Sequence, residues 1–129
     1  MDQQVMLQHG AFSWNELITT DVPAAKAFYA KLFGWEMHDE QAHGMVYTIL
    51  TAGDQKVGGM MALPAEAQGM APAWGAYVTV DDVDSQTAKA EQLGAKVIVA
   101  PCDIPKVGRF AVIRDPQGAI LSLITYRQE

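Results

Sequence analysis

Residues 14–34, WNELITTDVPAAKAFYAKLFG, decide the fold because the chain repeats their pattern once. Sixty residues later, residues 74–94 read WGAYVTVDDVDSQTAKAEQLG. Composition alone predicts about one or two coincidences over a window of this length. Aligned without a gap, the stretches match at Trp14 with Trp74, Thr19 with Thr79, Asp21 with Asp81, Ala30 with Ala90 and Gly34 with Gly94. The repetition predicts two copies of one supersecondary unit that share a core.

Each copy predicts a short strand, an aspartate cap and a helix that ends at glycine. In the first copy Asp21 is expected to accept from the free amides of the first turn, and Pro23 loses nothing there by lacking an N–H. Gly34 supplies the left-handed residue that ends the helix. Apolar side chains at helical spacing predict one stripe, made of Ala24, Ala25, Phe28 and Leu32.

The second copy follows the same order with a more polar helix. Its cap is Asp81, Asp82 or Asp84, so the acidic run at residues 81–84 indicates helix capping and not cation binding. The helix is expected to place Val83, Thr87 and Ala90 on one face and to stop at Gly94.

The remaining segments complete two β-α-β-β-β modules, at about residues 10–63 and 73–126, joined by the Pro- and Ala-rich linker 64–72. The predicted strands are residues 35–38, 45–51 and 56–63 in the first module, and 73–80, 95–100, 109–114 and 119–126 in the second. Polar loops are expected at 39–44 and 101–108, and the second helix at 84–93. We expect a single α+β domain whose cupped, mostly antiparallel eight-stranded sheet surrounds a cleft. The long sheet edges predict a homodimer that hides them.

Composition excludes several classes of protein. The formal net charge of −6 and the few, scattered Lys and Arg residues argue against nucleic-acid binding. No apolar run reaches membrane-spanning length, and residues 1–6 do not look like a secretory signal. The single cysteine, Cys102, excludes an internal disulfide and favours a cytoplasmic setting. The expected cleft predicts a small-molecule ligand. The alternative, a protein–protein or regulatory module, has no positive feature in the sequence.

Two motifs carry a resemblance to a known family. The first is the Asp-led helix with FYAKLFGW at residues 28–35, and the second is the turn DPQG at 115–118 followed by AILSL. In this order and spacing, across residues 10–126, the chain resembles the vicinal oxygen chelate superfamily of glyoxalase I, bleomycin-resistance proteins and extradiol dioxygenases. The opening FSWNEL at 12–17 resembles the branch described only as glyoxalase-related.

That resemblance implies a divalent metal held by His, Gln or Glu side chains from four strands, with an open position for vicinal substrate oxygens. The four ligand positions fall on Trp14, on Gly75 (or Trp74 if the register is one off), on Ser122, and on Gly59 or Met60. Indole, glycine and thioether are not ligands for a hard cation, and a lone hydroxyl is a poor one. The sequence therefore predicts no metal and no other cofactor, with a divalent metal as the alternative.

Glu16 is the acid that could restore chemistry to such a site. It shares strand parity with Trp14, so its carboxylate could face the cleft, where it would be costly unless paired or hydrogen-bonded. One interpretation makes it a ligand-contacting or catalytic group of a lyase, isomerase or dioxygenase with a non-standard site. The other makes it a structural partner of an Arg or Lys.

Other polar residues predict little chemistry. His38 and His43 lie near Asp39 and Glu40 in a predicted loop, which indicates a solvated turn and not a metal site. His9 is expected to be solvated, and Cys102 is expected to be a small, partly buried residue without an activating neighbour. Arg109 is a candidate for binding an anionic group.

Aromatic and soft side chains are expected on or near the cleft wall. They are Trp14, Tyr47, Met60, Trp74, Tyr77 and Ser122, joined by Glu16. The alternative is that most of them belong to the core, because strand parity does not settle which face lines the cleft. The sequence predicts a metal-free protein that binds a small, partly apolar molecule, and whether it catalyses a reaction stays open.

Overall fold

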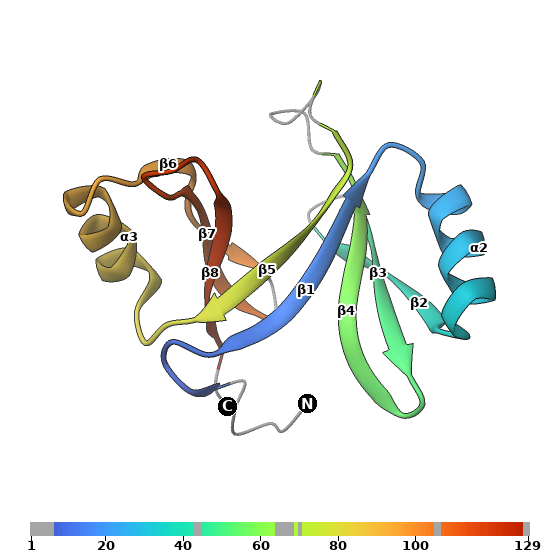
Figure 1. The fold of residues 1–129 in the computed structure, drawn as a ribbon. Coiled ribbons are helices and arrows are strands. Elements are labelled where there is room, and N and C mark those ends of the chain that lie inside the picture. Colours follow the sequence, from blue (N-terminus) through green and yellow to red (C-terminus); the bar gives the residue numbers. More distant parts are fainter. Residues whose placement is uncertain (1–6, 43–44, 64–68, 70, 105–106, 128–129) are drawn as a thin grey trace. The chain divides into compact units, whose positions relative to one another are not determined.

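The computed structural model describes residues 7–42, 45–63, 69, 71–104 and 107–127. In this part of the chain there are two helices and eight strands, and the strand order is β2-β3-β4-β1-β5-β8-β7-β6. The elements are β1 (Phe12–Thr19), α2 (Val22–Phe33), β2 (Glu36–Ala42), β3 (Met45–Ala52), β4 (Gln55–Ala62), β5 (Ala73–Thr79), α3 (Val83–Gln92), β6 (Lys96–Ile104), β7 (Gly108–Arg114) and β8 (Ile120–Tyr126). The predicted α+β class and the doubled β-α-β-β-β order are confirmed (Figure 1).

The chain divides into two compact units, each with one helix. The α2 unit is Trp14–Gly75, and the α3 unit combines Met1–Ser13 with Ala76–Glu129. Strands β1 and β5 each cross from one unit into the other. Figure 1 shows α2 beside β2 and β4, and α3 beside β6, β7 and β8. The predicted single domain with its module boundaries stays a prediction.

The α2 unit has one parallel and two antiparallel strand pairs. Strand β1 runs parallel to β4, while β2–β3 and β3–β4 are antiparallel. Leu17 and Met60 lie opposite each other in the β1–β4 pair and form the buried cluster with Leu50. Because three apolar side chains from neighbouring strands gather there, this face of the sheet needs a cover, and α2 supplies it.

Helix α2 begins and ends as the sequence predicts, but it faces the sheet differently. Asp21 Oδ1 accepts from the Ala24 N–H at 3.0 Å, and Gly34 ends the helix in the left-handed conformation with φ 74°. The helix packs on the core through residues at helical spacing, namely Val22, Ala25 and Tyr29. Of the predicted apolar stripe, Ala25 packs on the core, whereas Ala24, Phe28 and Leu32 are exposed.

The α3 unit repeats this plan with a polar helix. Strand β5 runs parallel to β8, and β8–β7 and β7–β6 are antiparallel. Its core consists of Val80, Val83, Ala111, Ile113 and Leu123. Of the three candidate caps, Asp82 is the one used, because its Oδ1 accepts from the N–H groups of Asp84 and Ser85 at 3.0 and 3.3 Å. The predicted inner face of the helix is confirmed by buried Val83 and Thr87 and by the packing of Ala90 on the core.

The repeat has a different register from the gap-free alignment. Leu17 faces the core opposite Met60, and Val78 does so opposite Leu123, so the equivalent residues Leu17 and Val78 of β1 and β5 are 61 positions apart. The caps Asp21 and Asp82 are also 61 apart, whereas the glycines that follow the helices are 60 apart because α3 is shorter. Trp14 therefore corresponds to Gly75, and its match with Trp74 is a coincidence of spacing.

Both predicted polar loops were partly wrong. Strand β2 continues through Asp39 to Ala42, and β6 continues through Cys102 to Ile104, since both stay paired with the neighbouring strand. Both strands lie at the ends of the strand order, where polar side chains meet solvent without cost. His43 and most of the linker 64–72 lie outside the described residues. Within the described chain, neither helix has the length and apolar content that crossing a bilayer requires.

Candidate functional site

The face of the α2 unit that points away from α2 carries the most chemically varied side chains. Gly59 lies opposite Glu16 in the β1–β4 pair and opposite Ile49 in the β3–β4 pair. Successive side chains of a strand point to opposite faces, so these residues lie on the face not occupied by Leu17 and Met60. Trp14 and Tyr47 share that parity. We call Trp14, Glu16, Tyr47 and Gly59 the β1–β4 site.

Tyr47 and Trp14 form the rigid part of this site. The Trp14 Nε1–H donates to the Tyr47 hydroxyl at 2.8 Å. A Cβ atom at Gly59 would collide with that hydroxyl and with the edge of the Tyr47 ring. Gly59 is therefore required by the close approach of an aromatic ring. The pair presents one aromatic wall with a fixed phenol oxygen.

Glu16 adds an acidic group to the same face. Its side chain is only 8% exposed, as expected if it lies at depth. A carboxylate at this burial is stable only if it is hydrogen-bonded or paired. Such a group can hold a proton donor of a ligand or take up a proton, so the β1–β4 site combines aromatic area with one acid.

Met60 and Trp74 lie elsewhere in the α2 unit. Met60 is 0% exposed and belongs to the core beneath α2, so it is not part of the β1–β4 site. Trp74 lies on the α2 side, where its Nε1–H donates to the Tyr29 hydroxyl at 3.2 Å and its ring meets Tyr29 edge-on at 5.4 Å. Together with Phe28 and Pro72 it lines a shallow groove of about 370 Å³. The predicted wall residues of this unit are thus divided between two faces of the sheet.

Tyr77 and Ser122 belong to the α3 unit and share one face there. They lie opposite each other in the β5–β8 pair, on the face away from α3. Tyr77 is 6% exposed, and its ring lies 6.4 Å from that of Phe110. By position in the repeat, Tyr77 corresponds to Glu16, Ser122 to Gly59 and Phe110 to Tyr47. The α3 unit therefore has a ring where the α2 unit has an acid.

One polar pair of the α3 unit was missed by sequence reasoning. The hydroxyls of Ser13 and Tyr126 lie 2.7 Å apart, and Ser13 is 1% exposed. Burial raises the pKa of Tyr126, and the hydrogen bond to Ser13 only partly opposes it. Residues 113 positions apart with no shared motif leave no signal in one sequence.

The remaining candidates have structural partners. Asp84 and Asp103 bind Arg109 at 2.7 and 3.1 Å, and these bonds raise the pKa of Arg109 above its ordinary value. The Arg109 guanidinium is therefore engaged by carboxylates, which does not favour its predicted role in binding an anion. His9 Nδ1 accepts from the backbone N–H of Asp81 at 3.0 Å, which shows a structural role.

Two further expectations need correction. His38 lies in β2, in agreement with the strand predicted at 35–38, and not in the solvated turn expected with Asp39 and Glu40. It is exposed, and its Nε2 lies 3.8 Å from Glu40 Oε1. Cys102 is exposed rather than buried, and partial desolvation raises the pKa of its thiol, so it has little thiolate character at neutral pH.

The positions that the superfamily uses for its metal do not fit a cation. At Trp14 the indole nitrogen spends its N–H on Tyr47 and offers no lone pair, and at Gly59 the space for a side chain is filled by the Tyr47 ring. Gly75 has no side chain, and Ser122 offers one hydroxyl. Among the residues that the structure describes, no group of three or more His, Cys, Asp or Glu side chains is placed to hold a metal ion.

Comparison with known families gives one match over most of the chain. Residues 8–123 match the family described as Glyoxalase/Bleomycin resistance protein/Dioxygenase superfamily. Among solved structures, methylmalonyl-CoA epimerase from Mycobacterium tuberculosis has a TM-score of 0.68 at 16% identity, over 99% of this chain and 94% of that chain. At that identity the likeness shows a shared fold.

Curated relatives are similar in sequence but longer. A protein named "Putative glyoxylase CFP32" from Mycobacterium tuberculosis is 47% identical over 116 residues, which are 89% of this chain and 44% of the relative. "Anthracycline biosynthesis protein DnrV" from Streptomyces peucetius is 32% identical over 129 residues, 88% of this chain and 46% of the relative. The chain thus spans about half the length of the curated relatives it matches.

Proposed function

Because the chain belongs to the glyoxalase/bleomycin resistance protein/dioxygenase superfamily, we propose that it binds a small, partly apolar molecule without a metal ion. The resemblance drawn from FYAKLFGW and DPQG agrees with this membership. One observation carries the proposal: the Tyr47 side chain fills the side-chain space of Gly59, and its hydroxyl oxygen accepts the Trp14 Nε1–H. Two positions that hold ligands in the superfamily are here an aromatic wall.

The proposed ligand is planar and aromatic, with a polar group near its edge. The Trp14–Tyr47 wall offers ring area for stacking, and Glu16 offers one acceptor for a hydroxyl or amine of the ligand. The relatives named for anthracycline biosynthesis support a ligand of this class. The proposed setting is the cytoplasm, where an exposed cysteine such as Cys102 stays reduced.

The first test measures the binding of an anthracycline to the protein through the quenching of the anthracycline's fluorescence. Trp14→Phe and Tyr47→Phe should each weaken binding, because each removes the hydrogen bond that holds the wall. Trp74→Phe is the matched control, since Trp74 lies on the α2 side of the same unit and should leave binding unchanged. Equal losses in Trp14→Phe and Trp74→Phe would contradict the assignment of the ligand to the β1–β4 site.

The second test is elemental analysis of protein purified without chelator. The proposal expects Ni, Zn, Fe and Mn far below one per chain, and activity or binding that chelators do not change. Stoichiometric metal, removed by chelator together with function, would overturn the metal-free proposal. It would also require ligands other than Trp14, Gly59, Gly75 and Ser122.

Buried Glu16 favours a second candidate, a lyase or isomerase that moves a proton. Its carboxylate shares a face with the Tyr47 phenol, so one group could accept a proton and the other could polarise an oxygen of the substrate. Glu16→Gln keeps the shape and removes the base. Turnover of a glyoxalase-type substrate that survives this change unaltered would exclude Glu16 from the mechanism.

A further inference from the structure

The groove beside helix α2 is lined by three aromatic rings, two of which stand perpendicular to the third. The Phe28 ring meets the Tyr29 ring at 85° with centroids 4.9 Å apart, and the Trp74 ring meets it at 82° and 5.4 Å. All three side chains, together with Asp21, line the groove of about 370 Å³. Rings set in this way form a corner, and not the flat patch that parallel rings would give. We call Asp21, Phe28, Tyr29 and Trp74 the α2 cage.

The rings of the α2 cage are held in place and yet accessible. The Trp74 Nε1–H donates to the Tyr29 hydroxyl at 3.2 Å, and the Trp35 ring stacks on Tyr29 at 5.7 Å. Tyr29 and Trp35 also pack against the core of the α2 unit. Phe28 is nevertheless 56% exposed and Trp74 42% exposed. A ligand would therefore find the rings already ordered, so binding would cost little additional side-chain entropy.

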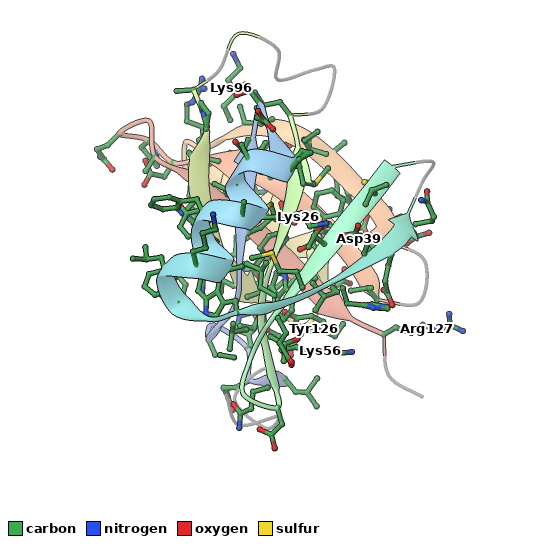
Figure 2. The ribbon with its side chains drawn as sticks, turned by 90° about the vertical axis from the view of Figure 1, so that its right-hand side faces the viewer. Lys26, Asp39, Lys56, Lys96, Tyr126 and Arg127 are labelled. Carbon is green, nitrogen blue, oxygen red and sulfur yellow. The ribbon has the colours of Figure 1, made fainter. Side chains whose placement is uncertain are left out.

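Asp21 gives this groove a negative charge. Its Oδ1 accepts from the Ala24 N–H, and no other residue that the structure describes forms a hydrogen bond or ion pair with Oδ2. The first lysine of α2, Lys26, is held by Asp39 on β2 at 3.0 Å (Figure 2). The amides at the start of α2 contribute about half a positive charge, which offsets the carboxylate only in part. The α2 cage thus combines ring faces with a weakly negative end.

The α3 unit folds in the same way without these rings, so the fold does not require them. At the spacing of the two helix caps, which is 61 residues, Phe28 corresponds to Lys89. Tyr29 corresponds to Ala90, which packs on the core of the α3 unit without a ring. Large apolar side chains that remain exposed, and that the equivalent unit does not need, indicate a place where something binds.

We propose that the α2 cage binds a small methylated ammonium ion, with the rings around the methyl groups and the Asp21 carboxylate beside the charge. The face of an aromatic ring attracts a cation, most strongly at tryptophan, and ring-lined cages of this kind hold quaternary ammonium groups. The formal net charge of −6 also favours a cationic ligand.

Hydration decides which class of cation fits. A metal ion needs several oxygen or nitrogen ligands, and a primary ammonium is compact and strongly hydrated, whereas the α2 cage offers ring faces and one carboxylate. A methylated ammonium carries apolar groups on its surface and loses little hydration among rings. The groove volume lies at the lower end of the range for small-molecule pockets, so the ligand is a free small molecule.

The α2 cage is separate from the β1–β4 site. Trp74 lies on the α2 side of the sheet, whereas Trp14 and Glu16 lie on the face that points away from α2. The inference therefore does not rest on the proposed function, and each can fail without the other.

Titration with choline, followed by the NMR signals of the tryptophan indole N–H groups, tests the proposal. Wild type should bind choline with a Kd of about 0.1 to about 5 mM, and the Trp74 signal should shift more than that of Trp14. The neutral carbon analogue of choline, in which a tert-butyl group replaces the trimethylammonium group, should bind at least about tenfold more weakly. Equal affinity for the two molecules, or no binding of choline, overturns the proposal.

Asp21→Asn removes the charge and keeps the helix cap, because asparagine caps a helix as well as aspartate does. This variant should bind choline about fivefold more weakly and bind the neutral analogue unchanged. Asp82→Asn is the matched control, since it changes the net charge equally at the cap of α3 and should leave choline binding unaltered. Equal losses in the two variants would show a long-range charge effect and overturn the assignment to the α2 cage.

Phe28→Leu tests the rings, because leucine keeps an apolar side chain at this exposed position and removes the aromatic face. Choline binding should weaken at least about threefold. Trp14→Phe, which tests the β1–β4 site, should leave choline binding unchanged. Choline binding that survives Phe28→Leu and is lost in Trp14→Phe overturns the proposal. Capture by phosphatidylcholine vesicles without binding of free choline would assign the α2 cage to a lipid headgroup and overturn the choice of a free ligand.

Discussion

The α2 and α3 units have equivalent core positions beneath their helices but different side chains on the far face of the sheet. Leu17 pairs with Met60 in one unit and Val78 with Leu123 in the other, both beneath a helix. On the far face, the α2 unit places an acid opposite a glycine that a ring covers, whereas the α3 unit places a tyrosine opposite a serine. The two units are alike at the positions that hold the helix and differ at the positions proposed to meet a ligand.

The helices differ in the same manner. Each unit holds its helix with an ion pair to the strands, Lys26 with Asp39 at 3.0 Å in one and Arg109 with Asp84 at 2.7 Å in the other. Figure 2 shows Lys26 on α2 and Asp39 on β2 together. Their outer faces do not match, since that of α2 is apolar and that of α3 is charged. The two helices are therefore held in the same way and differ in the surface that they expose.

Truncating a core side chain in either unit should lower the free energy of unfolding more than any other change proposed here. Met60→Ala and Leu123→Ala should each lower the free energy of unfolding by about 3 kcal/mol, because each empties a site of equivalent depth beneath a helix. Urea unfolding of both variants measures this. Met60→Ala should leave anthracycline binding unchanged, and a specific loss of binding would return Met60 to the cleft wall predicted from sequence.

Substitutions at equivalent positions of the two far faces should have the next largest effect on the free energy of unfolding, and the effect should differ between the units. Gly59→Ala drives a methyl group into the Tyr47 ring and should cost about 2 kcal/mol, with loss of the Trp14 hydrogen bond. Ser122→Ala at the equivalent position of the α3 unit should cost less than about 0.5 kcal/mol. In a Tyr47→Ala background the penalty of Gly59→Ala should nearly vanish, because the colliding ring is gone. An undiminished penalty there would show that the backbone, and not Tyr47, requires glycine.

The sequence predicted the elements and the inner face of α3, but not which apolar side chains of α2 face the sheet. Caps such as Asp21 and Gly34 are local, since an aspartate and a glycine act on the amides and carbonyls nearest to them. The predicted stripe on α2 combined one residue that the sheet covers, Ala25, with three that are exposed, because apolar side chains lie on more than one side of this helix. Only the sheet decides which set is covered, and Val22, Ala25 and Tyr29 are the ones that reach it.

The candidate site shows the same limit. Glu16 was found by strand parity with Trp14, which is a local property of one strand. The contact between Tyr47 and Gly59 joins two strands through a register that bulges between Leu50 and Thr51, so spacing alone does not give it. The matched tryptophans misled for the opposite reason. The gap-free alignment pairs Trp14 with Trp74. In the α2 unit, however, Trp14 lies on the face of the sheet that points away from α2, and Trp74 lies on the face that α2 covers.

Removing an ion pair between a helix and a strand should change the free energy of unfolding least. The pH dependence of that change distinguishes a charge effect from a packing effect. The Thr48 hydroxyl donates to Asp39 at 2.7 Å, and this bond, with the Lys26 ammonium, holds the pKa of Asp39 below its ordinary value of 3.8. A depressed folded pKa gives stability that is present above about pH 4 and lost as pH falls through the folded value. Asp39→Asn should therefore lower the free energy of unfolding by about 0.5 kcal/mol at pH 7, after allowance for solvent screening, and not at all near pH 2.

Urea unfolding midpoints across this pH range measure the effect. Asp84→Asn is the matched variant, since Arg109 lowers the pKa of Asp84 in the same direction. If the two variants lose their effects over the same pH range, the helices are held by equivalent charges, and the units differ only in what they present outward. A loss for Asp39→Asn that persists at low pH would mean that the buried Thr48 hydroxyl, and not charge, fixes β2 to β3.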